Sequence, residues 1–260
     1  MRWYKVKALM VRDFLILRRS KWRFLQLFYF PLTTIIIWGL FALFSKAFAL
    51  EAGLIVLAIN IFWSFSLQSQ SGINNMVNED VWSGSLKQVL TTGISESEYV
   101  FARILTSMIT SFAILLAMIL MSVYWFGLTI ITANIPLTLL FTTSTLIASV
   151  GLAIVITACF VYLGREYSFL AWTALQMFIL LSAPFYPVDI FPEPFKTIAY
   201  GMPFTGLFSG IRELITTSTV SNSIITLSLA VPIIYLVVSL PLLKHAFRRA
   251  KRTGLLANID

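Results

Sequence analysis

The chain has 260 residues, of which 58% are hydrophobic and 12% are Asp, Glu, Lys or Arg. Soluble domains average about 25% charged residues, so this composition excludes an ordinary soluble protein and indicates an integral membrane protein. The net charge of +8 could suggest nucleic-acid binding, but the basic residues gather at the two ends of the chain and indicate membrane orientation instead. We therefore expect no nucleic-acid partner.

Residues 1–23 precede the first long apolar run and are rich in Lys and Arg. Apolar side chains recur at helical spacing on one side of this segment, at Trp3, Met10, Phe14 and Leu17. Basic side chains recur on another side, which is the pattern of a helix that lies in the membrane interface. The segment therefore predicts an amphipathic interface helix on the inner leaflet. A disordered basic tail whose charges only set the topology is the alternative.

Six runs are apolar enough to cross a bilayer, which takes about 20 residues each. They are residues 24–44, 53–77, 99–126, 135–163, 168–186 and 223–243. An even number of spans places both termini on one side of the membrane. With that side in the cytoplasm, all of the nineteen Lys and Arg residues except Lys46, Lys196 and Arg212 are cytoplasmic, as the positive-inside rule requires. The sequence predicts one all-α domain, residues 1–260, in a cell (inner or plasma) membrane.

Residues 78–98 form the predicted cytoplasmic loop between the second and third spans. The loop contains an apolar stripe at i, i+4, i+7 and i+8, formed by Trp82, Leu86, Val89 and Leu90. Gly93 is suited to end this short helix, and Ser95 with Glu98 matches a capping box that begins the next one. An exposed apolar stripe suggests a surface that docks on a cytoplasmic partner. The alternative is a helix that packs on its own bundle.

Polar side chains follow one face of the predicted second span. They are Asn60, Ser64, Gln68, Ser71 and Asn75, which are three or four residues apart. Because lipid penalises amide groups, this face must look inward. The stripe either lines a transport pathway or forms hydrogen bonds between helices, and the pattern favours neither.

Five of the nine prolines fall in the predicted outer segment, residues 184–215, between the fifth and sixth spans. They are Pro184, Pro187, Pro192, Pro194 and Pro203. The segment is also rich in aromatic residues, which favours short helices that dip into the outer leaflet over a soluble loop. Non-helical backbone at that depth must be buried in protein or line a cavity.

The residues that most enzymes need are missing from the predicted spans. The single histidine, His245, lies beyond the last span, and the chain has neither HExxH nor GxxxxGK[ST]. We therefore expect no catalytic site and no metal site, and any ATPase must be another chain. No charged residue lies near the middle of a predicted span, which weighs against an ion-coupled secondary transporter. A non-transporting membrane scaffold or accessory subunit is a further alternative.

Taken together, the six spans, the N-terminal helix, the loop and the Pro-rich segment resemble the transmembrane (permease) subunit of ABC-2 type ABC transporters. The loop matches the family as E-D-V-W-S-G-S-L-K-Q-V-L-T-T-G-I-S-E-S-E, with acidic Glu79 followed by the Gly-Ser-Leu of residues 84–86. The Pro-rich element matches at Pro203 and Arg212. Gly93 departs from the family, because many members carry Pro there.

This resemblance implies an ATP-driven exporter with a pathway for an amphipathic drug, a lipid or a lipid-linked glycan. The chain would pair with a second copy of itself or a homologous permease, in contact with membrane lipid. Two ABC ATPase subunits would hold the ATP and Mg, so the chain itself would need no cofactor. The loop would be the coupling helix in an ATPase groove, formed by Glu79, Asp80, Trp82, Gly84, Ser85, Leu86, Val89 and Leu90. The outer segment would form paired re-entrant helices near a gate, with Phe185, Tyr186, Pro187, Pro192, Pro203 and Arg212.

Overall fold

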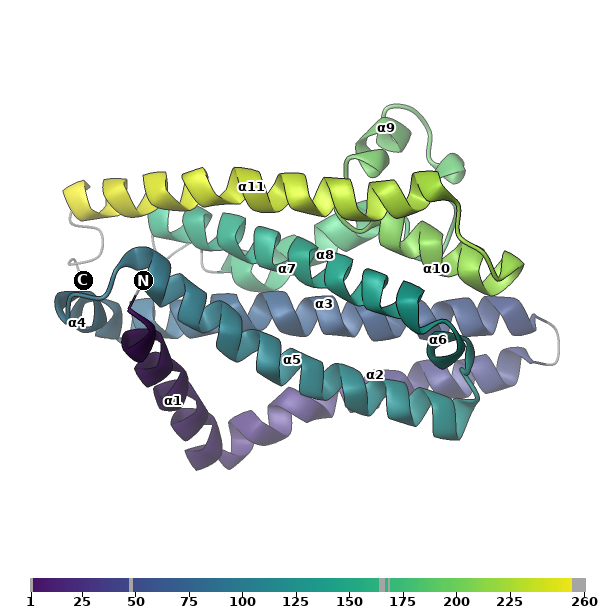
Figure 1. Cartoon of the computed structure of the whole chain (residues 1–260), viewed down its shortest axis with the longest axis horizontal. Coiled ribbons are helices and arrows are strands. Elements are labelled where there is room, and N and C mark those ends of the chain that lie inside the picture. Colours follow the sequence, from purple (N-terminus) through teal and green to yellow (C-terminus); the bar gives the residue numbers. More distant parts are fainter. Residues whose placement is uncertain (1, 47–48, 164–166, 168, 254–260) are drawn as a thin grey trace.

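The structure is a computed structural model and describes residues 2–46, 49–163, 167 and 169–253. Its long helices run side by side in one bundle, and α1 begins where α11 ends, at what we call the terminal end (Figure 1). No strand occurs among the residues described. The elements are α1 (Trp3–Arg19), α2 (Lys21–Ser45), α3 (Leu50–Trp82), α4 (Ser85–Thr91), α5 (Glu96–Phe126), α6 (Ile130–Ala133), α7 (Ile135–Leu163), α8 (Leu170–Leu181), the 3-10 helix η2 (Val188–Ile190), α9 (Phe195–Tyr200), α10 (Thr205–Thr217) and α11 (Asn222–Thr253).

Five of the described helices are long and apolar enough to cross a membrane, whereas the sequence predicts six spans. They are α2, α3, α5, α7 and α11. The longest, α3, has 33 residues and is therefore about 50 Å long at 1.5 Å per residue. The hydrocarbon core of a bilayer is about 30 Å thick, so α3 extends beyond it.

The predicted fifth span, residues 168–186, lies partly outside the described residues, and its described helix is short. α8 has 12 residues, or about 18 Å, which does not cross a bilayer. The helix ends because Ala183 takes the left-handed conformation, with φ at 51°, and Pro184 cannot continue a helix. The chain then leaves the bundle through η2 and α9 and returns as α10, further along toward the start of α11 (Figure 1). Two short helices, α8 and α10, therefore stand where the sequence predicts one continuous fifth span between α7 and α11.

α3 lies at the centre of the packing and contacts α2, α5, α7, α8 and α10. Two buried apolar clusters follow it along the bundle. One surrounds Leu57, Phe62 and Phe65, and the other surrounds Ile73 and Tyr99 nearer the terminal end. The sequence of α3 is apolar on most of its circumference because this helix has neighbours on most sides.

Buried hydrogen bonds join α3 to α7. The hydroxyl oxygens of Ser66 and Ser149 are 2.9 Å apart. About two helical turns further along α3, Asn74 Nδ2 donates to the carbonyl oxygen of Ala153 at 2.8 Å and to Thr157 Oγ1 at 2.9 Å. These directional contacts in an apolar surrounding fix the register of the two helices.

The N-terminal segment forms the predicted helix, so it is not a disordered tail, but the helix ends before Ser20. There the chain turns sharply into α2 (Figure 1). The face of α1 that packs on α5 carries Val6, Leu9 and Asp13, all buried. Trp3, on the predicted apolar side, is 58% exposed, and its ring centroid lies 6.5 Å from that of Phe101 on α5.

Candidate functional site: a buried charge cluster beside a cavity

The loop between α3 and α5 is a short helix with defined ends. α4 begins after Gly84, with φ at 69°, and ends before Gly93, with φ at 74°, and glycine adopts these left-handed conformations at little cost. At the start of α5, Glu98 N donates to Ser95 Oγ at 3.2 Å and Ser95 N donates to Glu98 Oε2 at 2.9 Å. The predictions of Gly93 as the helix terminator and of the capping box are confirmed.

The apolar stripe of this loop is not the exposed surface that the sequence suggests. Trp82 is the last residue of α3 rather than part of the loop helix, and it is 54% exposed. Leu86 is only 2% exposed and belongs to the apolar cluster shared by α1, α3 and α5, with Val89 and Leu90 half-buried against it. The alternative of packing on the chain's own bundle therefore holds for these three residues. The exposed residues of α4 are Lys87, Gln88 and Thr91.

Arg103 of α5 is completely buried between carboxylates from two other helices. Its guanidinium donates to Asp13 of α1 and to Asp80 near the end of α3. Arg12 donates to both oxygens of Asp80, at 2.9 and 3.0 Å. We call Arg12, Asp13, Asp80 and Arg103 the charge cluster. Its two positive and two negative charges balance, as burial of charged groups requires.

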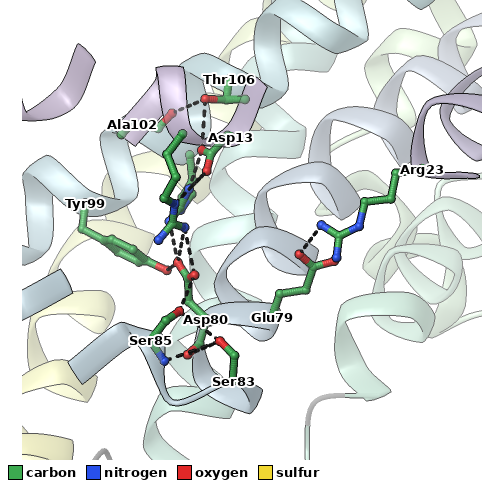
Figure 2. Close-up of polar contacts among 11 residues, drawn as sticks. Asp13, Arg23, Glu79, Asp80, Ser83, Ser85, Tyr99, Ala102 and Thr106 are labelled. Atoms are coloured by element: carbon green, nitrogen blue, oxygen red, sulfur yellow. Dashed lines mark hydrogen bonds and ion pairs between the residues drawn. The ribbon is translucent and has the colours of Figure 1, made fainter. Parts of the chain in front are cut away.

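Hydroxyl groups complete the bonding of the two carboxylates (Figure 2). Asp80 accepts hydrogen bonds from Tyr99 of α5 at 2.7 Å and from Ser85, the first residue of α4, at 2.8 Å. Asp13 accepts a longer one from Thr106 at 3.4 Å. Among the described residues, no group of three or more His, Cys, Asp or Glu side chains could hold a metal ion. The carboxylates of the charge cluster are instead neutralised by guanidinium groups.

Of the charge cluster, sequence analysis identifies only Asp80 as a candidate functional residue. Arg103 is counted there only among the cytoplasmic basic residues, and Asp13 is not singled out. One signal for the cluster is present in α5, where Tyr99, Arg103 and Thr106 recur at i, i+4 and i+7 on one face. The partners of that face come from distant segments, so local periodicity does not identify them.

Further polar contacts hold the start of α1 against the loop after α4. Arg2 Nη2 lies 3.1 Å from Glu98 Oε2, and the backbone N of Arg2 donates to Glu98 Oε1 at 2.6 Å. The hydrogen bond to Glu98 raises the pKa of Arg2. Lys5 Nζ donates to the carbonyl oxygen of Thr92 at 2.9 Å. α1 therefore contacts the loop at its start and the charge cluster further along.

A cavity of about 310 Å³ lies between the elbow of α1 and α2 and the pair α3 and α5. The charge cluster lines one part of it, and apolar side chains of α2, including Leu27 and Phe30, line another. Gln68, Ser71 and Asn75 of α3 are also in its wall. The cavity thus has charged, amide and apolar surfaces within one small volume.

The predicted polar stripe of α3 divides into two parts. Asn60 and Ser64 are buried, 6% and 8% exposed, and do not line the cavity. Ser64 Oγ lies 3.5 Å from a threonine hydroxyl of α2, which is a contact between helices. Gln68, Ser71 and Asn75 face the cavity instead. The stripe therefore has two surroundings, a contact between helices at Ser64 and a cavity at Gln68, Ser71 and Asn75.

The segment after α8 has an aromatic centre. Phe185 lies between two tryptophans, with its ring centroid 5.9 Å from that of Trp38 on α2 and 5.8 Å from that of Trp63 on α3. Tyr186 packs edge-on against Phe191 at 5.3 Å. Phe185 thus holds the segment against the bundle, and the Tyr186–Phe191 pair packs within the segment.

Arg212 of α10 connects this helix to the end of α8. Its guanidinium donates to the carbonyl oxygens of Ala183 at 2.7 Å and Pro184 at 2.8 Å. These carbonyls follow the end of α8, where a helix leaves such groups without internal partners. Three of the predicted gate prolines precede the short helices η2, α9 and α10; these are Pro187, Pro192 and Pro203.

Comparison with known families gives one extended match. A family model described as ABC-2 type transporter matches residues 4–216, about four fifths of the chain. The match begins in α1 and ends in α10, so it includes the charge cluster, the residues that line the cavity and the segment after α8. No curated protein matches the chain.

Proposed function

The chain belongs to the ABC-2 type transporter family, and on this basis we propose that it is the membrane-spanning subunit of an ATP-driven exporter. It is a multi-pass membrane protein. ABC ATPase partner chains hydrolyse the ATP, and a second copy or a homologous permease completes the pathway. The exported molecule is amphipathic: a drug, a lipid or a lipid-linked glycan.

The proposed topology places the terminal end of the bundle in the cytoplasm. Its support is the basic residues at both ends of the chain, which the positive-inside rule assigns to that side. α1 then lies at the inner interface, because the side away from the bundle exposes Tyr4, Val11 and Leu15 next to Lys7 and Arg18. α8 and α10 together make one crossing, the fifth in chain order, between those of α7 and α11. η2 and α9 dip into the outer leaflet.

The observation that carries the coupling mechanism is the position of Asp80. This one carboxylate accepts hydrogen bonds from Arg12 of α1, Ser85 of α4, and Tyr99 and Arg103 of α5. A displacement of α4 therefore reaches three other helices through short, buried, charge-assisted contacts. Such a connection favours rigid-body transmission over local bending.

The division of roles on α4 follows from burial. Leu86, Val89 and Leu90 anchor the helix to its own bundle, so they transmit motion rather than dock. The docking surface for the ATPase consists of exposed residues: Trp82, Lys87, Gln88 and Thr91. Trp82 is the natural anchor of this surface, because exposed tryptophans that become buried in an interface carry a large share of binding energy.

Trp82→Ala tests this surface. If Trp82 is an anchor, its truncation costs about 2 kcal/mol or more of binding, roughly thirtyfold in affinity. The tagged chain is purified from native membranes, and the co-purified ABC ATPase is identified and quantified by mass spectrometry. Trp125→Ala is the matched control, because Trp125 is 63% exposed near the opposite end of α5. Equal ATPase recovery with both variants would show that α4 is not the docking element.

Export itself needs a separate test. The purified complex is reconstituted in proteoliposomes with headgroup-labelled amphiphiles, and their movement between leaflets is followed with and without ATP. ATP-dependent movement supports the exporter. A complex that hydrolyses ATP but moves no amphiphile, drug or lipid would identify the chain as an accessory subunit instead.

A further inference from the structure

Polar side chains with accessible surface line part of the cavity. Gln68 and Ser71 of α3 are both in its wall and both partly exposed. The amide of Gln68 and the hydroxyl of Ser71 can each donate and accept hydrogen bonds. A polar group removed from water without such a bond is unfavourable. An occupant that offers both a donor and an acceptor would pair with these two side chains.

The charges around the cavity cancel. Three arginines and three acidic residues line it, namely Arg12, Arg23, Arg103, Asp13, Glu79 and Asp80. These side chains are already paired, since the charge cluster neutralises itself and Arg23 Nη1 lies 2.8 Å from Glu79 Oε2. An anion or a cation would therefore have to displace an existing partner or remain uncompensated. This balance favours an occupant without net charge.

The walls of the cavity change from charged to apolar. The charge cluster lies nearest the terminal end, Ser71 and Asn75 follow along α3, and Gln68 lies at the level of apolar side chains. On α2 the wall is formed by Leu27 and Phe30. A volume of about 310 Å³ is at the small end of ligand pockets. It fits the polar head of an amphiphile better than a whole lipid.

We propose that this cavity binds the head of an amphiphile that has no net charge and carries both hydrogen-bond donors and acceptors. A zwitterionic phospholipid with an ammonium head has this chemistry. The same chemistry can belong to the exported molecule at its loading position, in which case the inference deepens the proposed function, or to a resident bilayer lipid. Gln68, Ser71 and Asn75 contact the head, and α2 contacts the start of the chains.

The test measures binding on the full-length chain without any ATPase. The chain is placed in phosphatidylcholine nanodiscs that contain a trace of photoactivatable phosphatidylethanolamine, phosphatidylcholine or phosphatidylglycerol, and cross-linked peptides are mapped by mass spectrometry. We expect phosphatidylethanolamine to label the cavity-lining parts of α2 and α3 about fivefold more than the other two probes, the equivalent of one hydrogen bond. Phosphatidylcholine lacks the donor, and phosphatidylglycerol carries a net charge.

Two variants check the site. Ser71→Phe fills the cavity and should reduce the labelling by phosphatidylethanolamine about fivefold or more, whereas Thr143→Phe on the exposed face of α7 should leave it unchanged. Gln68→Leu removes the accessible amide from the wall of the cavity with little change of volume, so it should abolish the preference over phosphatidylcholine. Gel filtration confirms that each variant is folded.

Equal labelling by the three probes, or labelling that Ser71→Phe and Gln68→Leu leave unchanged, would overturn the proposal. Because no ATPase is present, this failure would not affect the exporter assignment. Adding the ATPase and ATP distinguishes the two sources of the ligand. Loss of the cavity label with ATP identifies the exported molecule, and a label that stays identifies a resident lipid.

Discussion

Arg103→Met would remove the central positive charge of the charge cluster and leave an apolar side chain in the core. The two carboxylates would be affected unequally. Asp80 would keep Arg12 at 2.9 and 3.0 Å, Tyr99 at 2.7 Å and a serine hydroxyl at 2.8 Å. Asp13 would keep only two contacts of 3.4 Å, from Arg12 Nε and from a threonine hydroxyl, near the limit of hydrogen bonding. The uncompensated charge would therefore reside on Asp13.

The expected loss of stability is about 3–5 kcal/mol, the usual cost of removing one partner of a buried ion pair. A second substitution shows where this cost arises. Adding Asp13→Asn to Arg103→Met should restore about half of the loss or more, because it neutralises the unpaired carboxylate. Adding Asp80→Asn should restore little, because Asp80 still pairs with Arg12 and its neutralisation would leave Arg12 without a counter-charge.

The measurement is the apparent melting temperature of the purified chain in detergent, followed by intrinsic tryptophan fluorescence. A loss of this size corresponds to a decrease on the order of 10 °C for a chain of this length. Arg23→Met is the control, because its ion pair with Glu79 is about half exposed and should contribute less than about 1 kcal/mol. A melting temperature of Arg103→Met equal to that of the parent chain, or stronger rescue by Asp80→Asn than by Asp13→Asn, would refute the reasoning.

Three further predictions concern other parts of the bundle. In a cysteine-free background, a cysteine at Lys87 should react with an impermeant maleimide only from the cytoplasmic side and one at Lys196 only from outside; reaction from one common side would contradict the topology. Gly206→Ala would place a Cβ 2.5 Å from the backbone N of Ser228 on α11, so it should lower stability by about 1–3 kcal/mol, and an unchanged melting temperature would mean that α10 and α11 are further apart. Phe185→Ala should cost roughly 1–3 kcal/mol because two aromatic contacts are lost, whereas Phe185→Trp should cost less; equal losses would exclude stacking as the cause.

The parts of the fold that the sequence predicts well depend on local chemistry. The capping box of Ser95 and Glu98 and the terminator Gly93 are confirmed because each acts within a few residues of backbone. The prediction of a fifth span as one continuous helix is wrong, also because of local backbone chemistry. Residues 168–186 are apolar enough to cross, but Pro184 at their end, together with the left-handed Ala183, stops the helix at Leu181. Hydropathy measures solubility in lipid and not helix continuity.

The candidate site depends on contacts that local patterns do not contain. Periodicity identifies the apolar side of α4 that includes Leu86, but it does not say whether that side packs on the same chain or on a partner; in the structure Leu86 packs on its own bundle. The charge cluster joins residues 90 positions apart, Asp13 and Arg103. In a membrane protein a basic residue such as Arg103 also fits the positive-inside rule, so its pairing with Asp13 is not evident from composition. The cavity exists only where α1, α2, α3 and α5 meet.

The break between α8 and α10 makes these two helices mechanically separate elements. A continuous helix carries a tilt along its whole length, but α8 and α10 are joined through their backbone by an irregular segment and across the break by two hydrogen bonds from Arg212. α10 can therefore change its angle against α8 when those two bonds exchange partners, and neither of these two helices has to unwind. α8 stays with α3 and α7, whose register the Asn74 contacts fix. Insertions or substitutions between residues 185 and 204 can then reshape the segment between α8 and α10 without altering the packing of α8 on α3 and α7.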